Sequence, residues 1–161
     1  ISLATCVLHP RQRGRISLRS ADPATPPVID HQLLGDDEDV RELVEGCREA
    51  MRILETDPLD QMLTDMIAPA KRPQTDAQWI EYLRASAFRG DHPAGTCRMG
   101  EDPAAVVDSR LRVNGIAGLR VVDASIIPAL TSGNTNAVVI MIAEKASAMI
   151  LEDAKAQQRP Q

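Results

Sequence analysis

The stretch from Gly90 to Gly100, which reads GDHPAGTCRMG, separates two different patterns in this sequence. Before it, apolar residues recur mainly at helical spacing; after it, short apolar runs alternate with turn-forming residues, as strands do. These patterns predict an α+β fold. A loop of this composition between regular elements is a common place for site residues. It contains His92, which we predict to be a catalytic base.

Helices are predicted on the N-terminal side of this stretch. Apolar residues from Val40 to Leu54 follow helical spacing, and the acidic run at residues 36–39 suits the positive end of a helix dipole. Thr75 and Gln78 fit a capping box, which predicts a helix to about Phe88 that ends at Gly90. A short helix is expected within residues 59–67.

Strands are predicted at both ends of the chain. Residues 1–8 and 15–20 suggest a hairpin closed at Gly14, followed by a short extended piece at residues 28–30. On the C-terminal side, residues 106–113 and 119–123 have strand patterns, and Asn114-Gly115 predicts a tight turn. A final helix over about residues 137–151 is apolar on most faces, so we expect it to be buried on most sides.

Composition excludes several classes of protein. The net charge of -5 argues against nucleic-acid and anionic-membrane binding, and the three aromatic residues leave few stacking platforms. No apolar run is long enough to span a membrane. Three cysteines without a spaced framework favour a reducing compartment, so we expect a cytoplasmic location. The chain opens on an apolar run at Ile1, which we interpret as part of a longer protein.

Three positions could work together chemically: His92 in the loop, Asp123 at the end of a predicted strand, and Asn136 at the start of the last helix. An imidazole can accept a proton near neutral pH. An amide and a helix N-terminus can stabilise a developing alkoxide. The combination suits proton abstraction from an alcohol, although an asparagine at a helix start is equally explained by capping.

Other chemistries fit less well. Activation of Cys97 by His92 needs an orienting third group that the pattern does not supply. A zinc site needs four ligands, and only these two are near one another, so we predict no metal. No glycine-rich phosphate-binding pattern occurs, so the chain has no nucleotide fingerprint of its own. Arg98 is interpreted as supporting the loop rather than touching substrate.

The chain closely resembles the C-terminal part of the glucose-methanol-choline oxidoreductases, which are FAD-dependent alcohol oxidases and dehydrogenases. The resemblance is carried by the blocks at residues 92–100, 107–108, 111–115, 119–128, 133–137 and 140–146. Earlier segments at residues 8–14, 20–23 and 27–30 are also similar. The match therefore runs in order along nearly the whole chain.

The resemblance implies a role for each site residue. It gives His92 the part of the base near the flavin, and it assigns the second catalytic position to Asn136, with Asn134 as the neighbour most easily confused with it. Asp123 and Ala124 match the block beside the flavin diphosphate and ribityl chain. The backbone at Asn136 and Ala137 would face the flavin pyrimidine edge. The hydride would pass from the alcohol carbon to flavin N5.

The resemblance also implies a division of the chain. Residues 1–100 would form a substrate-binding domain with a mixed or antiparallel sheet and flanking helices. Residues 101–151 would be a strand-helix segment that completes an FAD-binding α/β domain, followed by a polar tail at residues 152–161. The glycine-rich N-terminal half of such enzymes is absent, and Asp91 stands where many members carry an aromatic residue. The implied partners are this missing half, FAD and a small alcohol.

Two alternatives stay open. A choline dehydrogenase-type enzyme would need an aromatic cage for the quaternary ammonium group, and only Trp79, Tyr82 and Phe88 are available here. The chain could instead be a catalytically inert fragment or a subunit module. The sequence leaves open the identity of the alcohol, the electron acceptor and the oligomeric state.

Overall fold

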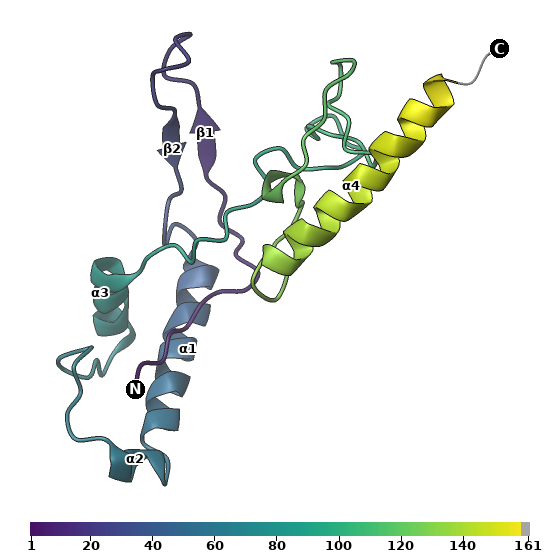
Figure 1. The fold of residues 1–161 in the computed structure, drawn as a ribbon. Coiled ribbons are helices and arrows are strands. Elements are labelled where there is room, and N and C mark those ends of the chain that lie inside the picture. The colour runs from purple at the N-terminus through teal and green to yellow at the C-terminus, as the bar shows by residue number, and fades with distance from the viewer. Residues whose placement is uncertain (159–161) are drawn as a thin grey trace. The chain divides into compact units, whose positions relative to one another are not determined.

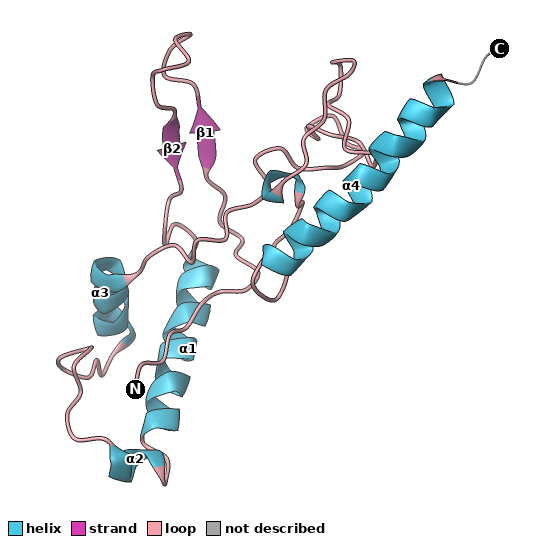
Figure 2. Cartoon of the chain, viewed as in Figure 1, coloured by secondary structure: helices cyan, strands magenta, loops and turns pink. Residues whose placement is uncertain are grey.

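The computed structural model describes residues 1–158, and the chain divides into two compact units at Gly90 and Asp91 (Figure 1). The first unit holds the strands β1 (Arg15–Ser17) and β2 (Val28–Asp30) and the helices α1 (Asp37–Leu54), α2 (Leu59–Met62) and α3 (Asp76–Ser86). The second holds the 3-10 helix η1 (Ala124–Ile126) and the helix α4 (Asn136–Gln157) (Figure 2). Helices and a small antiparallel sheet are thus segregated along the chain, as in the predicted α+β class.

The only sheet found within residues 1–158 is a two-stranded hairpin. β1 (Arg15–Ser17) pairs antiparallel with β2 (Val28–Asp30), with Ile16 opposite Ile29. The predicted pairing of residues 15–20 with residues 1–8 is therefore wrong. The strands connect through a turn stabilised by Asp22, whose carbonyl accepts from the Thr25 amide at 3.1 Å. Gly14 instead allows the backbone to pass close to Asp30, because a Cβ at position 14 would lie 2.2 Å from the Asp30 carbonyl oxygen.

The first residues of the chain pack along a helix rather than forming a strand. The Thr5 hydroxyl lies 3.4 Å from the Cys47 sulfur of α1. Gly46 gives this segment room, because a Cβ at that position would come within 3.3 Å of the Thr5 Cβ. Thr5 and Val7 are half-buried, whereas Ile1, Leu3 and Leu8 are exposed, so this apolar run forms neither a strand nor part of the core.

α1 (Asp37–Leu54) confirms the predicted helix and its acidic start. The Asp36 side chain accepts from the Glu38 and Asp39 amides, which satisfies two of the donors left free at a helix N-terminus. Asp39 is buried and accepts from the Arg11 and Gln12 amides at 3.0 Å each. The acidic run therefore both begins the helix and binds the preceding loop to it.

Two further helices complete the first unit. α2 (Leu59–Met62) is shorter than predicted, and α3 (Asp76–Ser86) begins at the expected Thr75 cap. α3 ends before Gly90, because Ala87 already has an extended backbone with ψ of 140°. Trp79 and Leu83 of α3 pack with Val44 and Met51 of α1, and these four buried side chains form the core of this unit.

The second unit is built mainly from turns around one helix. η1 (Ala124–Ile126) and α4 (Asn136–Gln157) are its named elements. The strands expected at residues 106–113 and 119–123 are reduced to isolated bridges, one of which joins Arg112 to Arg120. Leu111 has φ of +64°, and the Asp108 carboxylate accepts from the Arg110 and Arg112 amides, so the chain turns where a strand would continue.

The predicted turn at Asn114-Gly115 is confirmed. The Ile116 amide donates to the Val113 carbonyl at 3.3 Å, and Gly115 has φ of +80°. The Val113 amide donates to the Leu119 carbonyl at 3.0 Å, so the two arms of the turn are paired.

One face of α4 packs on the core of its own unit. The buried members of that core are Val107, Leu111, Ile126, Ile127, Ile142 and Ala146. The expectation that this helix is buried on most sides is wrong for this chain, because Ile140, Met141 and Leu151 are 56%, 53% and 60% exposed. The core of the second unit covers one side of α4, and the other side is exposed.

Candidate active site

The loop that contains His92 lies against η1 inside the second unit. The Cys97 amide donates to the Ser125 carbonyl at 3.0 Å, and the Met99 amide donates to the Ile126 carbonyl at 2.8 Å. Gly95 has φ of +87°, and a Cβ there would come within 3.3 Å of the Ile127 carbonyl oxygen. A glycine is therefore required at this point for the loop to follow η1 closely.

Arg98 braces the far end of the loop, in agreement with the interpretation from the sequence. Its guanidinium donates to both carboxylate oxygens of Asp102, at 2.8 and 2.6 Å. This pair, with the Ala104 amide, lowers the pKa of Asp102 to about 2. The Arg98 carbonyl also accepts from the Val106 amide at 3.0 Å, so both the backbone and the side chain of Arg98 are committed to the loop.

His92 contacts the segment that leads into α4. Its Nε2 lies 3.1 Å from Asn134 Oδ1, and its Nδ1 lies 3.2 Å from Thr135 Oγ1. The imidazole is exposed, whereas Thr135 is buried. Both ring nitrogens therefore have a partner from one short segment, which fixes the plane and the direction of the ring.

The start of α4 offers free backbone donors beside this pair. Thr135 is the N-cap residue, and its carbonyl accepts from the Val139 amide at 2.9 Å. The amides of the first turn have no acceptor within the helix, and they carry its partial positive charge. Asn136 and Ala137, the first two helical residues, are exposed. An anionic or electron-rich group placed there would meet favourable N–H donors.

The structure brings Asn134, and not Asn136, into contact with His92. The difference follows from the helix start. The sequence pattern predicts a helix from about Ala137, which makes Asn136 the expected capping residue. In the structure Thr135 occupies the N-cap position, so Asn134 precedes the helix and reaches the imidazole. Thr135 was missed as a site residue, because a threonine at a helix start signals capping alone.

Asp123 and Ala124 lie at η1, the element against which the His92 loop packs. The Asp123 carboxylate accepts from the Ser125 amide at 2.7 Å and so caps η1. Ala124 is half-buried and packs against the core. These two of the four residues predicted for cofactor binding are thus in the same unit as His92, on a segment that is hydrogen-bonded to its loop.

The residues present fit one end of FAD. The exposed first turn of α4 supplies N–H donors, and the small side chain of Ala137 leaves the backbone open to a flat ring. Glycines in a phosphate-binding arrangement do not occur in this sequence. The exposed first turn of α4 could therefore meet the edge of the isoalloxazine ring.

The alternative chemistries receive no geometric support. Both nitrogens of His92 face Asn134 and Thr135, so His92 is not paired with Cys97. All three cysteines are free thiols. Within residues 1–158, no group of three or more His, Cys, Asp or Glu side chains gathers closely enough to hold a metal ion. None of the helices in that range is long and apolar enough to cross a membrane.

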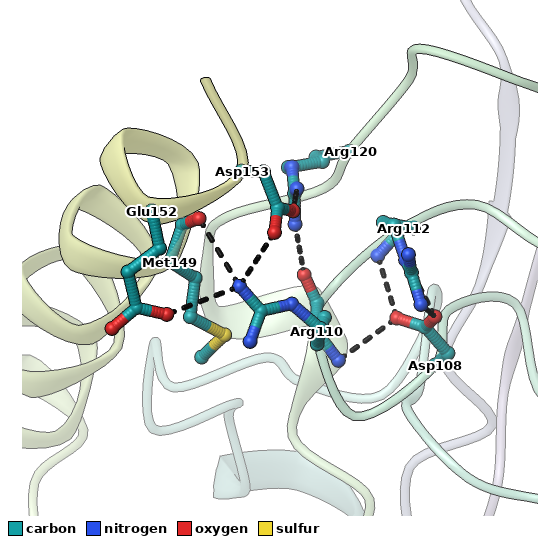
Figure 3. A network of polar contacts seen from close by, with 7 residues as sticks. All are labelled: Asp108, Arg110, Arg112, Arg120, Met149, Glu152 and Asp153. Atoms are coloured by element: carbon teal, nitrogen blue, oxygen red, sulfur yellow. Dashed lines mark hydrogen bonds and ion pairs between the residues drawn. The ribbon is translucent and has the colours of Figure 1, made fainter. Parts of the chain in front are cut away.

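A polar network holds the C-terminal half of α4 to the loop that precedes η1 (Figure 3). Arg110 Nη2 donates to the Met149 carbonyl at 3.2 Å and to Asp153 at 2.8 Å, and it also reaches Glu152. Arg120 donates to the other Asp153 oxygen and to the Arg110 carbonyl. The Arg120 and Arg110 hydrogen bonds lower the pKa of Asp153. The network anchors the helix whose other end contacts His92.

Comparison with known proteins identifies close relatives. The family model described as GMC oxidoreductase matches residues 10–143. The chain is 43% identical over 150 residues to an alcohol dehydrogenase [acceptor] from Pseudomonas putida, covering 93% of this chain and 27% of that protein. It is 46% identical over 133 residues to an oxygen-dependent choline dehydrogenase from Acinetobacter baumannii, covering 83% of this chain and 24% of that protein.

The chain is also similar in structure to a solved protein. The chain superimposes on pyridoxine 4-oxidase from Mesorbium loti with a TM-score of 0.82 and 33% identity, covering 88% of this chain and 28% of that one. The chain therefore spans about a quarter of the length of the curated relatives it matches.

Proposed function

This chain belongs to the GMC oxidoreductase family, and we propose on that basis that it supplies the proton-abstracting site of an FAD-dependent enzyme that oxidises a CH–OH group to an aldehyde or ketone. The observation that carries the proposal is the contact of His92 Nε2 with Asn134 Oδ1 at 3.1 Å, beside the open first turn of α4. A base, an amide and a positive helix end within one segment suit an alcohol that loses a proton and a hydride.

His92 is the base in this mechanism. In the neutral tautomer that carries its proton on Nδ1 and donates it to Thr135 Oγ1, Nε2 is free to accept the proton of a substrate hydroxyl that takes the place of the Asn134 contact. The Asn134 amide turns its N–H toward the substrate oxygen and stabilises the negative charge that develops there. The imidazolium that forms keeps its Nδ1–H on Thr135 Oγ1. FAD, when bound, supplies the acceptor for the hydride that leaves the alcohol carbon.

The residues proposed to hold the cofactor are those predicted from the sequence. Asn136 and Ala137 would offer first-turn amides to the pyrimidine edge of the flavin, where the positive helix end favours negative charge. Asp123 and Ala124, at η1, would lie beside the ribityl chain and the diphosphate. In this proposal Asn136 keeps its predicted cofactor-binding role, and the catalytic role predicted for it is assigned to Asn134 because Asn134 contacts His92.

The rest of the protein would complete the site. We assign residues 1–100 to a substrate-binding domain and residues 101–151 to the C-terminal segment of an FAD-binding domain. The partner of this segment would be the N-terminal FAD-binding half that longer relatives carry. The exposed apolar side chains of α4, including Ile140 and Met141, are a surface that such a half could cover.

The proposal is tested on the intact gene product. Its flavin absorbance should be bleached by an alcohol under anaerobic conditions, and His92→Ala should slow this step by about 100- to 10,000-fold. His31→Ala is the matched control, because His31 is exposed in the first unit and should keep the rate. Undiminished bleaching in His92→Ala would overturn the mechanism, and a colourless protein that stays inert with added FAD would favour a module without catalysis.

The identity of the alcohol is a separate question. A choline-type substrate needs exposed aromatic faces around its ammonium group. Trp79 is 3% exposed and lies in the core of the first unit, so it cannot supply such a face. A panel that compares choline with uncharged primary alcohols by kcat/KM would decide between these substrate classes.

A further inference from the structure

Thr135 stands out as a buried polar residue at the start of α4. Its side chain is 7% exposed, and it occupies the N-cap position. Threonine hydroxyls at this position usually accept from an amide of the first turn. Here the side chain makes no such bond, and its hydroxyl lies 3.2 Å from His92 Nδ1. The hydroxyl is therefore directed to the imidazole at the expense of capping.

A hydroxyl is well suited to this position because it can both donate and accept. With a proton on Nε2 alone, the Thr135 hydroxyl donates to the free Nδ1. With a proton on Nδ1, whether the ring is neutral or cationic, Thr135 Oγ1 accepts from it. The same contact is thus kept in every protonation state through which a base passes, and Nε2 stays directed toward Asn134.

Thr135 is itself held in place by the helix. Its carbonyl accepts from the Val139 amide at 2.9 Å, and the first turns of α4 pack through Val138 and Ile142 against the core of the second unit. The hydroxyl therefore has a fixed position from which to orient the ring. Asn134 is exposed, so its side chain has more freedom to respond to a substrate.

We propose that Thr135 is a positioning residue for the reaction: its hydroxyl holds His92 through Nδ1, so that Nε2 faces the substrate oxygen and the imidazolium keeps a hydrogen-bond partner. This inference rests on the proposed function, in which His92 is the base. It makes the threonine before Asn136 a determinant of the proton-transfer step, although Thr135 would touch neither substrate nor cofactor.

The test compares Thr135→Val, which has the same shape but no hydroxyl, with Thr135→Ser, which restores the hydroxyl. Both are made in the intact gene product with ¹⁵N-labelled histidine, and the His92 imidazole signals are assigned by their loss in His92→Gln. Thr131→Val is the matched control, because the Thr131 hydroxyl is exposed and makes a long contact of 3.5 Å to the Gly133 carbonyl. Thr135→Ala gives a second hydroxyl-free variant in case the valine variant does not fold.

Two readouts should change together. Thr135→Val should alter the difference between the Nδ1 and Nε2 shifts of His92, whereas Thr135→Ser and Thr131→Val should keep the wild-type pattern. Turnover by Thr135→Val should fall about 10- to 100-fold in kcat with KM changed less than about threefold, and Thr135→Ser should recover most of it. A role in helix stability alone would leave the nitrogen shifts unchanged.

The outcomes separate this inference from the proposed function. Wild-type nitrogen shifts and kcat in Thr135→Val, with His92→Ala inactive, would overturn the positioning role and leave the proposed function standing. Full turnover in His92→Ala would overturn both, because a positioning residue needs a base to position.

Discussion

At the scale of single residues, the site depends on which asparagine meets His92. Asn134 lies 3.1 Å from the imidazole, and Asn136 begins the helix two positions later. We expect Asn134→Ala to lower kcat about 100- to 1,000-fold, since it removes the donor proposed for the developing alkoxide. Asn136→Ala should act mainly on flavin binding. Stopped-flow reduction by alcohol, with flavin content measured in parallel, separates the two effects. A larger loss of reduction rate in Asn136→Ala would restore the prediction made from the sequence.

The sequence identifies the histidine of this site but not the residues that contact it. His92 could be singled out, because the composition of its loop is unusual and a family resemblance covers it. The residues that contact it could not be identified, because Asn134, Thr135 and Asn136 are consecutive. Which of them faces His92 depends on where the helix begins. Helix starts carry an uncertainty of one to two residues even in structures. Here a shift of that size exchanged one asparagine for another.

At the scale of elements, Ile126 connects η1 to the loop that contains His92. It is 1% exposed, and its carbonyl accepts from the Met99 amide at 2.8 Å. Ile126→Ala should lower the free energy of unfolding by about 2–5 kcal/mol, because it leaves a cavity in the core. Ile116→Ala, at a position that is 56% exposed, should change it by less than about 0.5 kcal/mol. Denaturant unfolding of both variants tests this, and equal effects would contradict the core assignment.

The anchoring network of α4 predicts a dependence of stability on pH. Arg120 and Arg110 lower the pKa of Asp153 below its ordinary value of 3.8. A carboxylate with a lowered folded-state pKa stabilises the fold above its unfolded pKa, and this contribution is lost as pH falls through the folded value. Asp153→Asn should therefore lower the thermal midpoint near pH 6, and the difference from wild type should shrink below about pH 4.

The neighbouring Glu152 gives a matched control for this prediction. It also contacts Arg110, but its side chain is 68% exposed and the distance is 3.3 Å. Glu152→Gln should therefore have the smaller effect, since exposed ion pairs contribute little. A difference between wild type and Asp153→Asn that is the same at pH 6 and pH 3 would show that the carboxylate charge does not stabilise α4.

The elements themselves were unequally predictable. α1 and the start of α3 follow from local signals, namely apolar spacing and capping side chains that act within a few residues. The hairpin, and the segments of the second unit that were predicted as strands, depend on partners far along the chain. Residues 1–8 contact α1 through Thr5 and form no strand, and residues 106–123 turn at Asp108 and Leu111 instead of extending. Short apolar runs such as these do not by themselves distinguish a strand from other structures.

At the scale of the whole molecule, the chain carries more apolar surface on α4 than its own second unit covers. Ile142 is 6% exposed and lies in the core, whereas Ile140 of the same helix is 56% exposed. Burial on most sides was predicted because this helix has apolar residues on most of its faces, but that pattern does not tell which faces the second unit itself covers. The presence of this helix was therefore predictable from its apolar pattern, whereas the exposure of Ile140 was not.

The two isoleucines give the final prediction, made in both the 161-residue chain and the intact gene product. Ile142→Ala should lower the free energy of unfolding by about 2–5 kcal/mol in both, because its core belongs to the second unit itself. Ile140→Ala should change it by less than about 0.5 kcal/mol in the chain alone, since the side chain is exposed there. In the gene product the same change should cost about 2–5 kcal/mol, because the remaining protein would cover that face. An Ile140→Ala variant as stable as wild type in both settings would mean that this face of α4 stays in solvent, and that the proposed FAD-binding half packs elsewhere.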